Sequence, residues 1–288
     1  MNLPVMVPGL DRDTILEWSR RIDAGPYSSL AAGERMFFPN PEIMVAMSAA
    51  AAVTERVQLN FSVIVLPMHS AVHIAKQIAT LDVISGGRVL LGVGVGGREE
   101  DYRAFDAPFD RKRLRKLEEQ VGVMRRAWAG EHVVEALRPL GPEPVQPGGP
   151  KVLAGSIDPR SIRRAARWAD GISGFTFATT RDEIAACFDT ARQAWRDEGR
   201  SEEPRLVTGC WYALGSRARA QLDEYLNRYL NFMGPEIARQ LAPTVPTTSE
   251  QKLRDVISMA ADLGCDELLL VPTSSDPDEV HRVADIIG

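Results

Sequence analysis

The sequence predicts an α/β fold in which eight strands alternate with helices and close into a (β/α)8 TIM barrel. Short apolar runs rich in β-branched residues recur along the chain, and segments with helical spacing of apolar residues lie between them. Strands that alternate with helices form parallel sheets, and one barrel fits a length of 288 residues. An open, doubly wound sheet is the alternative. No linker or internal repeat divides the sequence, so we expect a single domain over residues 1–288.

The first half of the chain supplies four of the expected strand–helix units. Apolar and β-branched runs predict strands at residues 3–7, 29–32, 57–66 and 88–95. Apolar spacing predicts helices at residues 13–22, 40–55 and 70–84, and another whose buried stripe runs from 114 to 128. Asn40 and Pro41 favour a helix start, as cap and first-turn residue. Gly86 favours a helix end, because glycine readily adopts the left-handed conformation found there.

The second half repeats the pattern after a loop rich in proline and glycine at residues 139–150. Strands are expected at residues 151–154, 171–177, 206–213 and 267–271. Helices are expected to begin at Asp158-Pro159, at residue 181, at the capping box Thr248-x-x-Gln251 and at Asp276-Pro277. A long helical region is expected between the last two strands, with Leu222, Leu226, Tyr229 and Phe232 on its apolar stripe.

The composition argues against several classes of protein. A formal net charge of −5 gives no electrostatic reason to expect a nucleic acid as partner, and we interpret the basic cluster at residues 111–116 as a solvated helix start. Three widely separated cysteines predict free thiols in a reducing compartment. The first residues lack the pattern of a secretory signal, and no apolar run reaches membrane-spanning length. We therefore expect a cytoplasmic protein without nucleic-acid or membrane partners.

Residues 59–102 carry a family resemblance. The segment LNFSVIVLPMHSAVHIAKQIATLDVISGGRVLLGVGVGGREEDY resembles the central block of the luciferase-like monooxygenase superfamily, whose members use FMN or the deazaflavin coenzyme F420. The portion from ATLD to REEDY is specific, because residue types and order match together. The pieces AAGER, FPNPE and AARWADG also recur in a deazaflavin-type branch. The resemblance covers roughly residues 1–200 well, and it implies a bacterial-luciferase-like barrel with a shortened insertion at about residues 131–150.

The glycine-rich loop after the fourth predicted strand is a candidate cofactor site. Its glycines satisfy the dinucleotide pattern GxGxxG, but the acidic residues about twenty positions further on fall on a helix, which argues against a Rossmann site. The resemblance implies that Gly96, Gly97 and Arg98 bind the cofactor, with the two glycines letting the backbone approach a flat ring. The alternative is that the glycines only relieve crowding at the barrel rim.

Two further segments are cofactor-binding candidates by resemblance. Ser62 and Val63 lie where the family often has a bulge with a non-proline cis peptide bond that supports the cofactor ring, although a plain strand is the alternative. Residues 154–156, which are Ala154, Gly155 and Ser156, join a strand to a helix start, an arrangement that favours phosphate binding. The family places its cofactor phosphate near here, and Phe175 is expected to line the same side.

Glu34 and Arg35 are the catalytic candidates. Many relatives have an acidic residue and a histidine at this place, near the reacting face of the ring, whereas this chain has arginine in the second position. Glu34 can act as a general base if it is buried, and Arg35 can hold an anionic group of substrate or cofactor. Alternatively, the two form only a structural ion pair. His69 follows the third predicted strand closely enough to reach the cofactor, but His69 and His73 lack a third ligand, so no metal is expected.

These observations predict an oxidoreductase that uses F420 for hydride transfer to or from a small organic substrate. The first alternative is an FMN-dependent monooxygenase that acts with molecular oxygen and a separate flavin reductase. The second is a non-catalytic flavin-binding protein, and a metal-dependent barrel hydrolase lacks its ligand set. The family further implies a homodimer, formed by the alanine-rich helix around residues 49–52 and the helix after it; packing within the core is the alternative explanation of the alanines.

Overall fold

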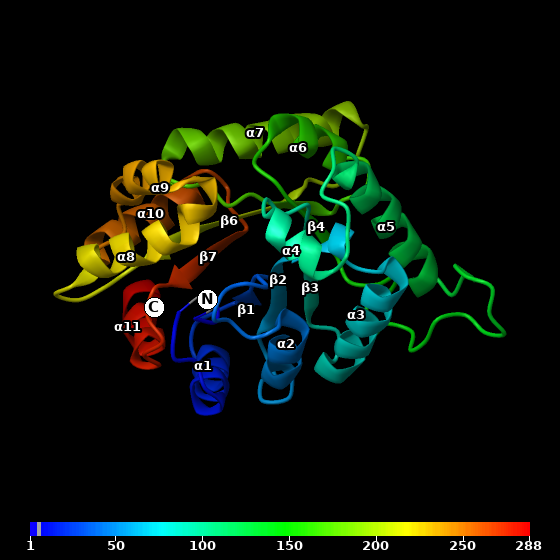
Figure 1. Ribbon diagram of the computed structural model, residues 1–288, viewed down its shortest axis with the longest axis horizontal. Coiled ribbons are helices and arrows are strands. Elements are labelled where there is room, and N and C mark those ends of the chain that lie inside the picture. The colour runs from blue at the N-terminus through cyan, green and yellow to red at the C-terminus, as the bar shows by residue number, and fades with distance from the viewer. Residues whose placement is uncertain (5–6) are drawn as a thin grey trace.

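The computed structural model describes residues 1–4 and 7–288 and shows one parallel sheet surrounded by helices (Figure 1). Its strands pair in sequence order from β1 to β7. Their bounds are β1 Ser29–Ala32, β2 Gln58–Val65, β3 Val89–Gly94, β4 Val152–Gly155, β5 Gly171–Ser173, β6 Arg205–Tyr212 and β7 Glu267–Pro272. A doubly wound sheet would place later strands on both sides of the first. The unbroken order therefore supports the predicted barrel.

The N-terminal residues close the barrel between its first and last strands. The amide of Asn2 donates to the carbonyl of Leu270 in β7 at 2.9 Å, and the amide of Leu3 donates to the carbonyl of Ala31 in β1 at 2.8 Å. Residues 1–3 thus take the eighth position of the ring, and the TIM-barrel prediction is confirmed. Of the strand predicted at residues 3–7, residues 5 and 6 lie outside the described residues.

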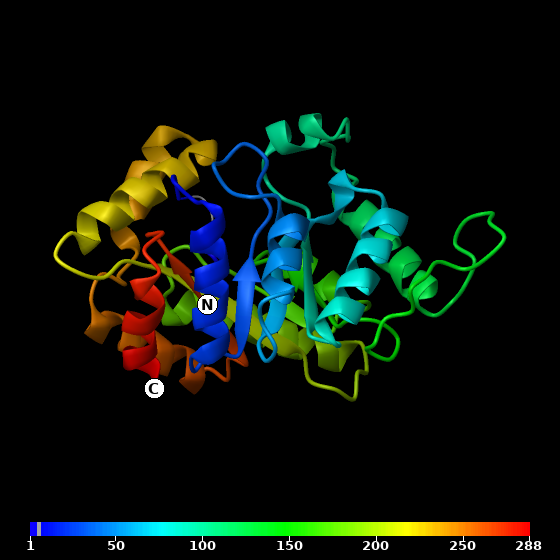
Figure 2. The same ribbon diagram turned by 90° about the horizontal axis from the view of Figure 1, so that it is seen from below.

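Helices cover the outside of the barrel (Figures 1 and 2). They are α1 Arg12–Ala24, α2 Ile43–Ala51, α3 Ala71–Ser85, α4 Glu99–Ala104, α5 Arg113–Trp128, α6 Pro159–Ala165, α7 Arg181–Asp197, α8 Ala218–Leu230, α9 Pro235–Leu241, α10 Glu250–Asp262 and α11 Asp278–Ile287. Three short 3-10 helices are η1 Leu66–Met68, η2 Asn231–Met233 and η3 Ala242–Thr244. The segment between α5 and β4 extends away from the barrel in both views, and among its described residues none forms a helix or strand.

Local chemistry explains most helix boundaries. The Ser70 side chain caps α3, and Gly86 ends it with a left-handed φ of 67°. Two predicted starts are wrong. The helix expected from Asn40 begins at Ile43, because Glu42 is its cap, and the capping box expected at residue 248 is replaced by a cap at Ser249. The strand expected over residues 171–177 ends at Ser173, which frees the residues after it to line a cavity.

Five apolar side chains from five different strands form a buried cluster inside the barrel, namely Ala31, Leu90, Leu153, Val207 and Leu269. All five are at most 1% exposed. A larger apolar cluster packs the helices onto the outside of the sheet. Because the interior is solid, as is usual in such barrels, functional groups belong on the loops at the carboxyl ends of the strands. Among the described residues, no helix is long and apolar enough to cross a membrane.

Candidate active site

A cavity of about 270 Å³ lies at the carboxyl ends of the strands. Its lining comprises Asn2, Gly33, Arg35, Ser62, Val63, Gly155, Ser156, Ile157, Ser173, Phe175, Phe177, Trp211, Tyr229, Phe232 and Val271. The predicted site residues that it brings together are Arg35, Ser62, Val63, Gly155, Ser156 and Phe175. Those that lie outside the lining are Glu34, Gly96, Gly97, Arg98 and Ala154.

An irregular segment of β2 lines part of the cavity. The pairing of β2 with β3 shifts register between Phe61 and Ile64, and the peptide bond between Ser62 and Val63 is cis, as predicted. The Val63 carbonyl accepts a hydrogen bond from the amide of Glu34 at 3.1 Å. This bond connects the irregular segment to the loop after β1, which carries the candidate catalytic residues.

Several glycines make room for this segment. A Cβ atom at Gly33 would lie 2.8 Å from the Ser62 carbonyl oxygen, and one at Gly155 would lie 2.7 Å from the Val63 side chain. Gly92 and Gly94 face residues 61–63 in the same way. Relief of crowding thus accounts for the first half of the glycine-rich loop.

Gly96 and Gly97 have different surroundings. Gly96 has a φ of +60°, and a Cβ atom there would meet Val65, whereas a Cβ atom at Gly97 would lie in ordinary contact with Phe232. Both positions border residues near the cavity without lining it. Their predicted cofactor contacts remain predictions.

The end of β4 joins the cavity to a smaller hollow of about 30 Å³, which Ala154, Gly155, Ser156 and Trp168 help to line. The Asp158 carboxylate caps α6 and accepts hydrogen bonds from the amide of Ser161 at 2.8 Å and from its hydroxyl at 2.9 Å. These bonds lower the pKa of Asp158. A phosphate here would therefore be repelled by the capped end of α6. Donors remain in the Ser156 hydroxyl and in the buried indole N–H of Trp168, which has no partner among the described residues.

Five aromatic residues, Phe175, Phe177, Trp211, Tyr229 and Phe232, form a set that we call the aromatic wall. The ring centroids of Phe175 and Trp211 are 4.5 Å apart, and those of Trp211 and Tyr229 are 5.4 Å apart. Sequence patterns identified Phe175 but placed Tyr229 and Phe232 in an ordinary helical stripe. Trp211 could have been found from its position near the carboxyl end of its strand.

Arg35 is held by two hydrogen bonds at the edge of the cavity. Its Nη1 donates to the Glu34 carbonyl at 2.6 Å, and its Nη2 donates to the Tyr229 hydroxyl at 2.6 Å. Burial lowers the pKa of the Arg35 guanidinium, but the contact with Tyr229 and the nearby Asp101 carboxylate together outweigh burial, and the pKa is raised overall. Arg35 therefore stays charged at all physiological pH values.

The ion pair considered for Glu34 and Arg35 does not form, so that interpretation is wrong. The Glu34 carboxylate instead accepts a hydrogen bond from the Val65 amide at 2.7 Å and lies 2.8 Å from Nε2 of His69. The Glu34 side chain is only 5% exposed. His69 also packs edge-on against Phe105, with ring centroids 4.6 Å apart, and it does not line the cavity. Chain geometry thus creates an acid–histidine pair from two different loops.

Arg98 lies behind the aromatic wall. Its guanidinium is 4.5 Å from the ring centroid of Phe38 and 4.3 Å from that of Phe232, and Nη2 donates to the Tyr229 carbonyl at 2.8 Å. Burial and the neighbouring charge of Arg35 lower the pKa of Arg98. In this position Arg98 fixes the wall, and its predicted contact with a cofactor remains a prediction.

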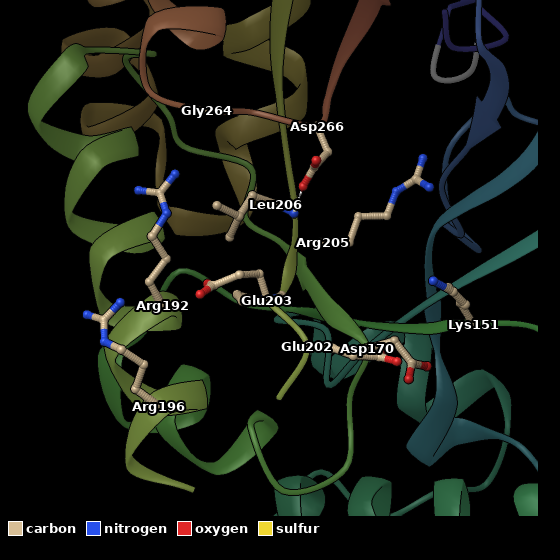
Figure 3. Close-up of a pocket in the computed structure, with 11 residues that line it drawn as sticks. Lys151, Asp170, Arg192, Arg196, Glu202, Glu203, Arg205, Leu206, Gly264 and Asp266 are labelled. Atoms are coloured by element: carbon tan, nitrogen blue, oxygen red, sulfur yellow. Dashed lines mark hydrogen bonds between the residues drawn. The ribbon is translucent and has the colours of Figure 1, made fainter. Parts of the chain in front are cut away.

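A larger cavity of about 690 Å³ lies at the opposite end of the barrel, where Figure 3 shows its mainly charged lining. Asp170 and Asp266 there accept hydrogen bonds from the amides of Val152 and Leu206 at the starts of strands. The amino ends of barrel strands generally carry residues that serve stability. Among the described residues, no group of three or more His, Cys, Asp or Glu side chains could hold a metal. The cavity of about 270 Å³ at the carboxyl ends of the strands is therefore the candidate active site.

The chain belongs to the luciferase-like monooxygenase family, whose family model matches residues 5–276. An uncharacterized protein of Mycobacterium tuberculosis is 33% identical over 171 residues, which cover 57% of this chain and 59% of that protein. The chain thus matches less than two thirds of the length of this relative. Family membership supports an enzymatic, oxidoreductase role.

Two solved structures share the fold. Monooxygenase RslO1 from Streptomyces bottropensis has a TM-score of 0.82 and 22% identity, with 99% of this chain and 96% of that chain covered. An F420-dependent secondary alcohol dehydrogenase, in complex with an F420–acetone adduct, has a TM-score of 0.75 and 16% identity, with 94% and 93% covered. At these identities the likeness concerns the fold alone.

Proposed function

We propose that this protein is an oxidoreductase that uses F420 for hydride transfer to or from a small organic substrate. The observation that carries the proposal is the cavity at the carboxyl ends of the strands, lined by the Ser62–Val63 peptide and by glycines on opposite sides of it. Family membership supplies the class of chemistry.

The residues of the cavity fit a flat ring system. Gly33 and Gly155 keep the surface beside Ser62 and Val63 free of side chains, and Phe175 adds an aromatic surface. The buried Oδ1 of Asn2, also in the lining, has no hydrogen-bond partner among the described residues and could accept one from a ring N–H. We assign cofactor contacts to Ser62, Val63, Gly155, Ser156 and Phe175, with Ala154, Gly96, Gly97 and Arg98 supporting them from outside the lining.

A bound deazaflavin would supply a hydride donor or acceptor that reacts poorly with oxygen. The protein residues would orient the substrate, exclude water and supply a proton. The aromatic wall excludes water from one side of the cavity. Arg35 cannot act as an acid or base, because a guanidinium keeps its protons. The Tyr229 hydroxyl accepts the bond from Arg35, so its own proton is available to a substrate oxygen.

Two observations favour F420 over FMN. The segment between α5 and β4 is short and lacks helix or strand in its described residues, whereas many flavin-binding relatives carry a longer insertion here. Only five of the 34 basic residues are lysines, which is typical of GC-rich genomes such as those of actinobacteria, where F420 is common. The mycobacterial relative agrees with such an origin.

The alternative is an FMN-dependent monooxygenase that acts with molecular oxygen and a separate reductase. It is favoured by the family model that matches this chain, which is described as luciferase-like monooxygenase. A non-catalytic flavin-binding protein remains a weaker alternative, because the family is one of enzymes.

Titration of the cofactor-free protein with F420 and, separately, with FMN tests the proposal. Quenching of tryptophan fluorescence reports binding, because Trp211 lines the cavity, and W211F should lose much of the quenching. Preference for F420 supports hydride transfer, and preference for FMN supports the monooxygenase. If neither cofactor binds, the proposed function fails.

We also propose a homodimer and a cytoplasmic location. Val45 of α2 and Val83 and Ile84 of α3 are 68%, 45% and 56% exposed, so adjacent helices present apolar side chains. Ala50 and Ala51 are buried within the chain itself and serve its own packing. Light scattering during gel filtration checks the mass, and V45E combined with I84E should give monomers if these helices form the interface.

A further inference from the structure

We infer that the substrate is an organic acid whose carboxylate binds Arg35 and whose apolar body lies against the aromatic wall. This inference rests on the proposed function. Arg35 is the only charged residue among the described residues of the cavity lining, and the aromatic wall supplies five of its other members. A cavity with one cation and a largely aromatic surface is complementary to a flat or apolar anion.

The hydrogen bonding of Arg35 is incomplete. Its Nη atoms bond the Glu34 carbonyl and the Tyr229 hydroxyl, and both of these acceptors are uncharged. Its Nε is buried and has no partner among the described residues. A buried donor without an acceptor is unfavourable, more so in a charged group. A carboxylate is the acceptor that a guanidinium fork binds best.

The surrounding charges leave Arg35 without a counter-ion. In the described part of the chain no carboxylate lies within 4.0 Å of either Arg35 or Arg98. Glu34 directs its carboxylate to His69 and Val65. Asp101, the remaining buried acid nearby, accepts a hydrogen bond from the Met36 amide and acts on both arginines only through space. Arg35 and Arg98 are thus two buried cations without an ion pair among the described residues, and of these two only Arg35 lines the cavity.

Arg35 is also far around the barrel rim from residues 154–156, where the sequence predicted a cofactor phosphate. Arg35 follows β1, whereas Ser156 follows β4 and Phe175 follows β5. In a ring with residues 1–3 in the eighth place, β1 and β5 stand on opposite sides. A cofactor phosphate near Ser156 would therefore not neutralise Arg35. The substrate is the ligand that would reach this side.

Calorimetric titration with benzoate and with benzamide, a neutral analogue of similar shape, tests the inference. Wild-type protein should bind benzoate at least roughly tenfold more tightly than benzamide, because hydrogen bonds to charged groups are the stronger ones. R35Q should lose about 10- to 100-fold in benzoate affinity. R103Q is the matched control, because Arg103 is exposed on α4 and its ion-pair partner in the described part of the chain is Glu99, and it should bind benzoate like wild type.

Each outcome has a defined meaning. Equal affinity for benzoate and benzamide in wild-type protein overturns the inference even if R35Q fails to fold. Unchanged benzoate binding by R35Q also overturns it. If R35Q keeps benzoate binding but loses F420 or FMN, Arg35 serves the cofactor and the inference is wrong. If benzoate binding depends on Arg35 while wild-type protein binds neither cofactor, the inference stands and the proposed function fails.

Discussion

Replacing Glu34 by alanine should destabilise the protein substantially, because its buried carboxylate is bonded to two donors from different segments. The Val65 amide lies 2.7 Å from Oε2, and Nε2 of His69 lies 2.8 Å from Oε1. Each buried donor left without an acceptor costs about 1–3 kcal/mol, so the loss of two acceptors in E34A should lower the free energy of unfolding by about 2–6 kcal/mol.

Glutamine offers a graded comparison at the same position. In E34Q the amide oxygen still accepts from Val65, and the amide nitrogen can donate to His69 in its other tautomer. We therefore expect a loss of only about 1 kcal/mol.

Urea unfolding, followed by circular dichroism, measures these differences, and E143A, at an exposed glutamate, is the control. If E34A unfolds within about 0.5 kcal/mol of wild type, the two hydrogen bonds do not hold the loop in solution. The role assigned to Glu34 would then be wrong.

Three further predictions address other parts of the molecule. G92A should destabilise the protein by at least about 1–3 kcal/mol, because its Cβ would collide with the Phe61 carbonyl. G122A, on the open face of α5, should instead stabilise it by about 0.5–1 kcal/mol. Urea unfolding compares the two variants, and equal effects would contradict the crowding argument. D158A should cost about 1 kcal/mol at pH 7. Hydrogen bonds in the folded protein lower the pKa of Asp158 below its ordinary 3.8, so the charged cap contributes its full stability above that pH. The stability difference between D158A and wild type should shrink as the pH falls through the pKa of Asp158 in the folded protein. A stability difference that persists at pH 2 would refute this. Burial raises the pKa of Cys265 to about 11. Iodoacetamide at pH 8 should therefore label this thiol roughly 100-fold more slowly in folded than in unfolded protein, which mass spectrometry can measure. Equal labelling rates would show that the thiol is not buried.

The sequence allowed the barrel to be predicted because each strand and helix is encoded locally. β1 occupies its expected residues, and β2 and β3 end within a residue or two of theirs. Runs of β-branched residues and the apolar stripes of helices are properties of short segments, so they can be recognised without knowing how the rest of the chain folds. Errors of one or two residues occurred where several polar residues compete for a cap: the caps are Glu42 instead of Asn40 and Ser249 instead of Thr248.

The site was less predictable, because its contacts join distant segments. Arg35 bonds Tyr229, and Glu34 pairs with His69, which follows a different strand. Spacing in the sequence carries no signal for these pairs, since they arise only when the loops meet at one rim. The general rule that barrel sites lie at the carboxyl ends of strands could have identified Trp211, but nothing local distinguished Tyr229 from the buried residues of its own helix.

Closure of the ring by residues 1–3 has a consequence for the folding of this chain. The final seam joins Asn2 to Leu270, so it cannot form during synthesis until Leu270 has left the ribosome. The entropic cost of closing a loop grows only with the logarithm of its length, so this long loop costs little more than a shorter one. Contacts between residues so far apart in the sequence nevertheless slow folding. Until then residues 1–3, which pair with β1 on their other side, and β7 both expose an unpaired edge, and such edges are a route to aggregation.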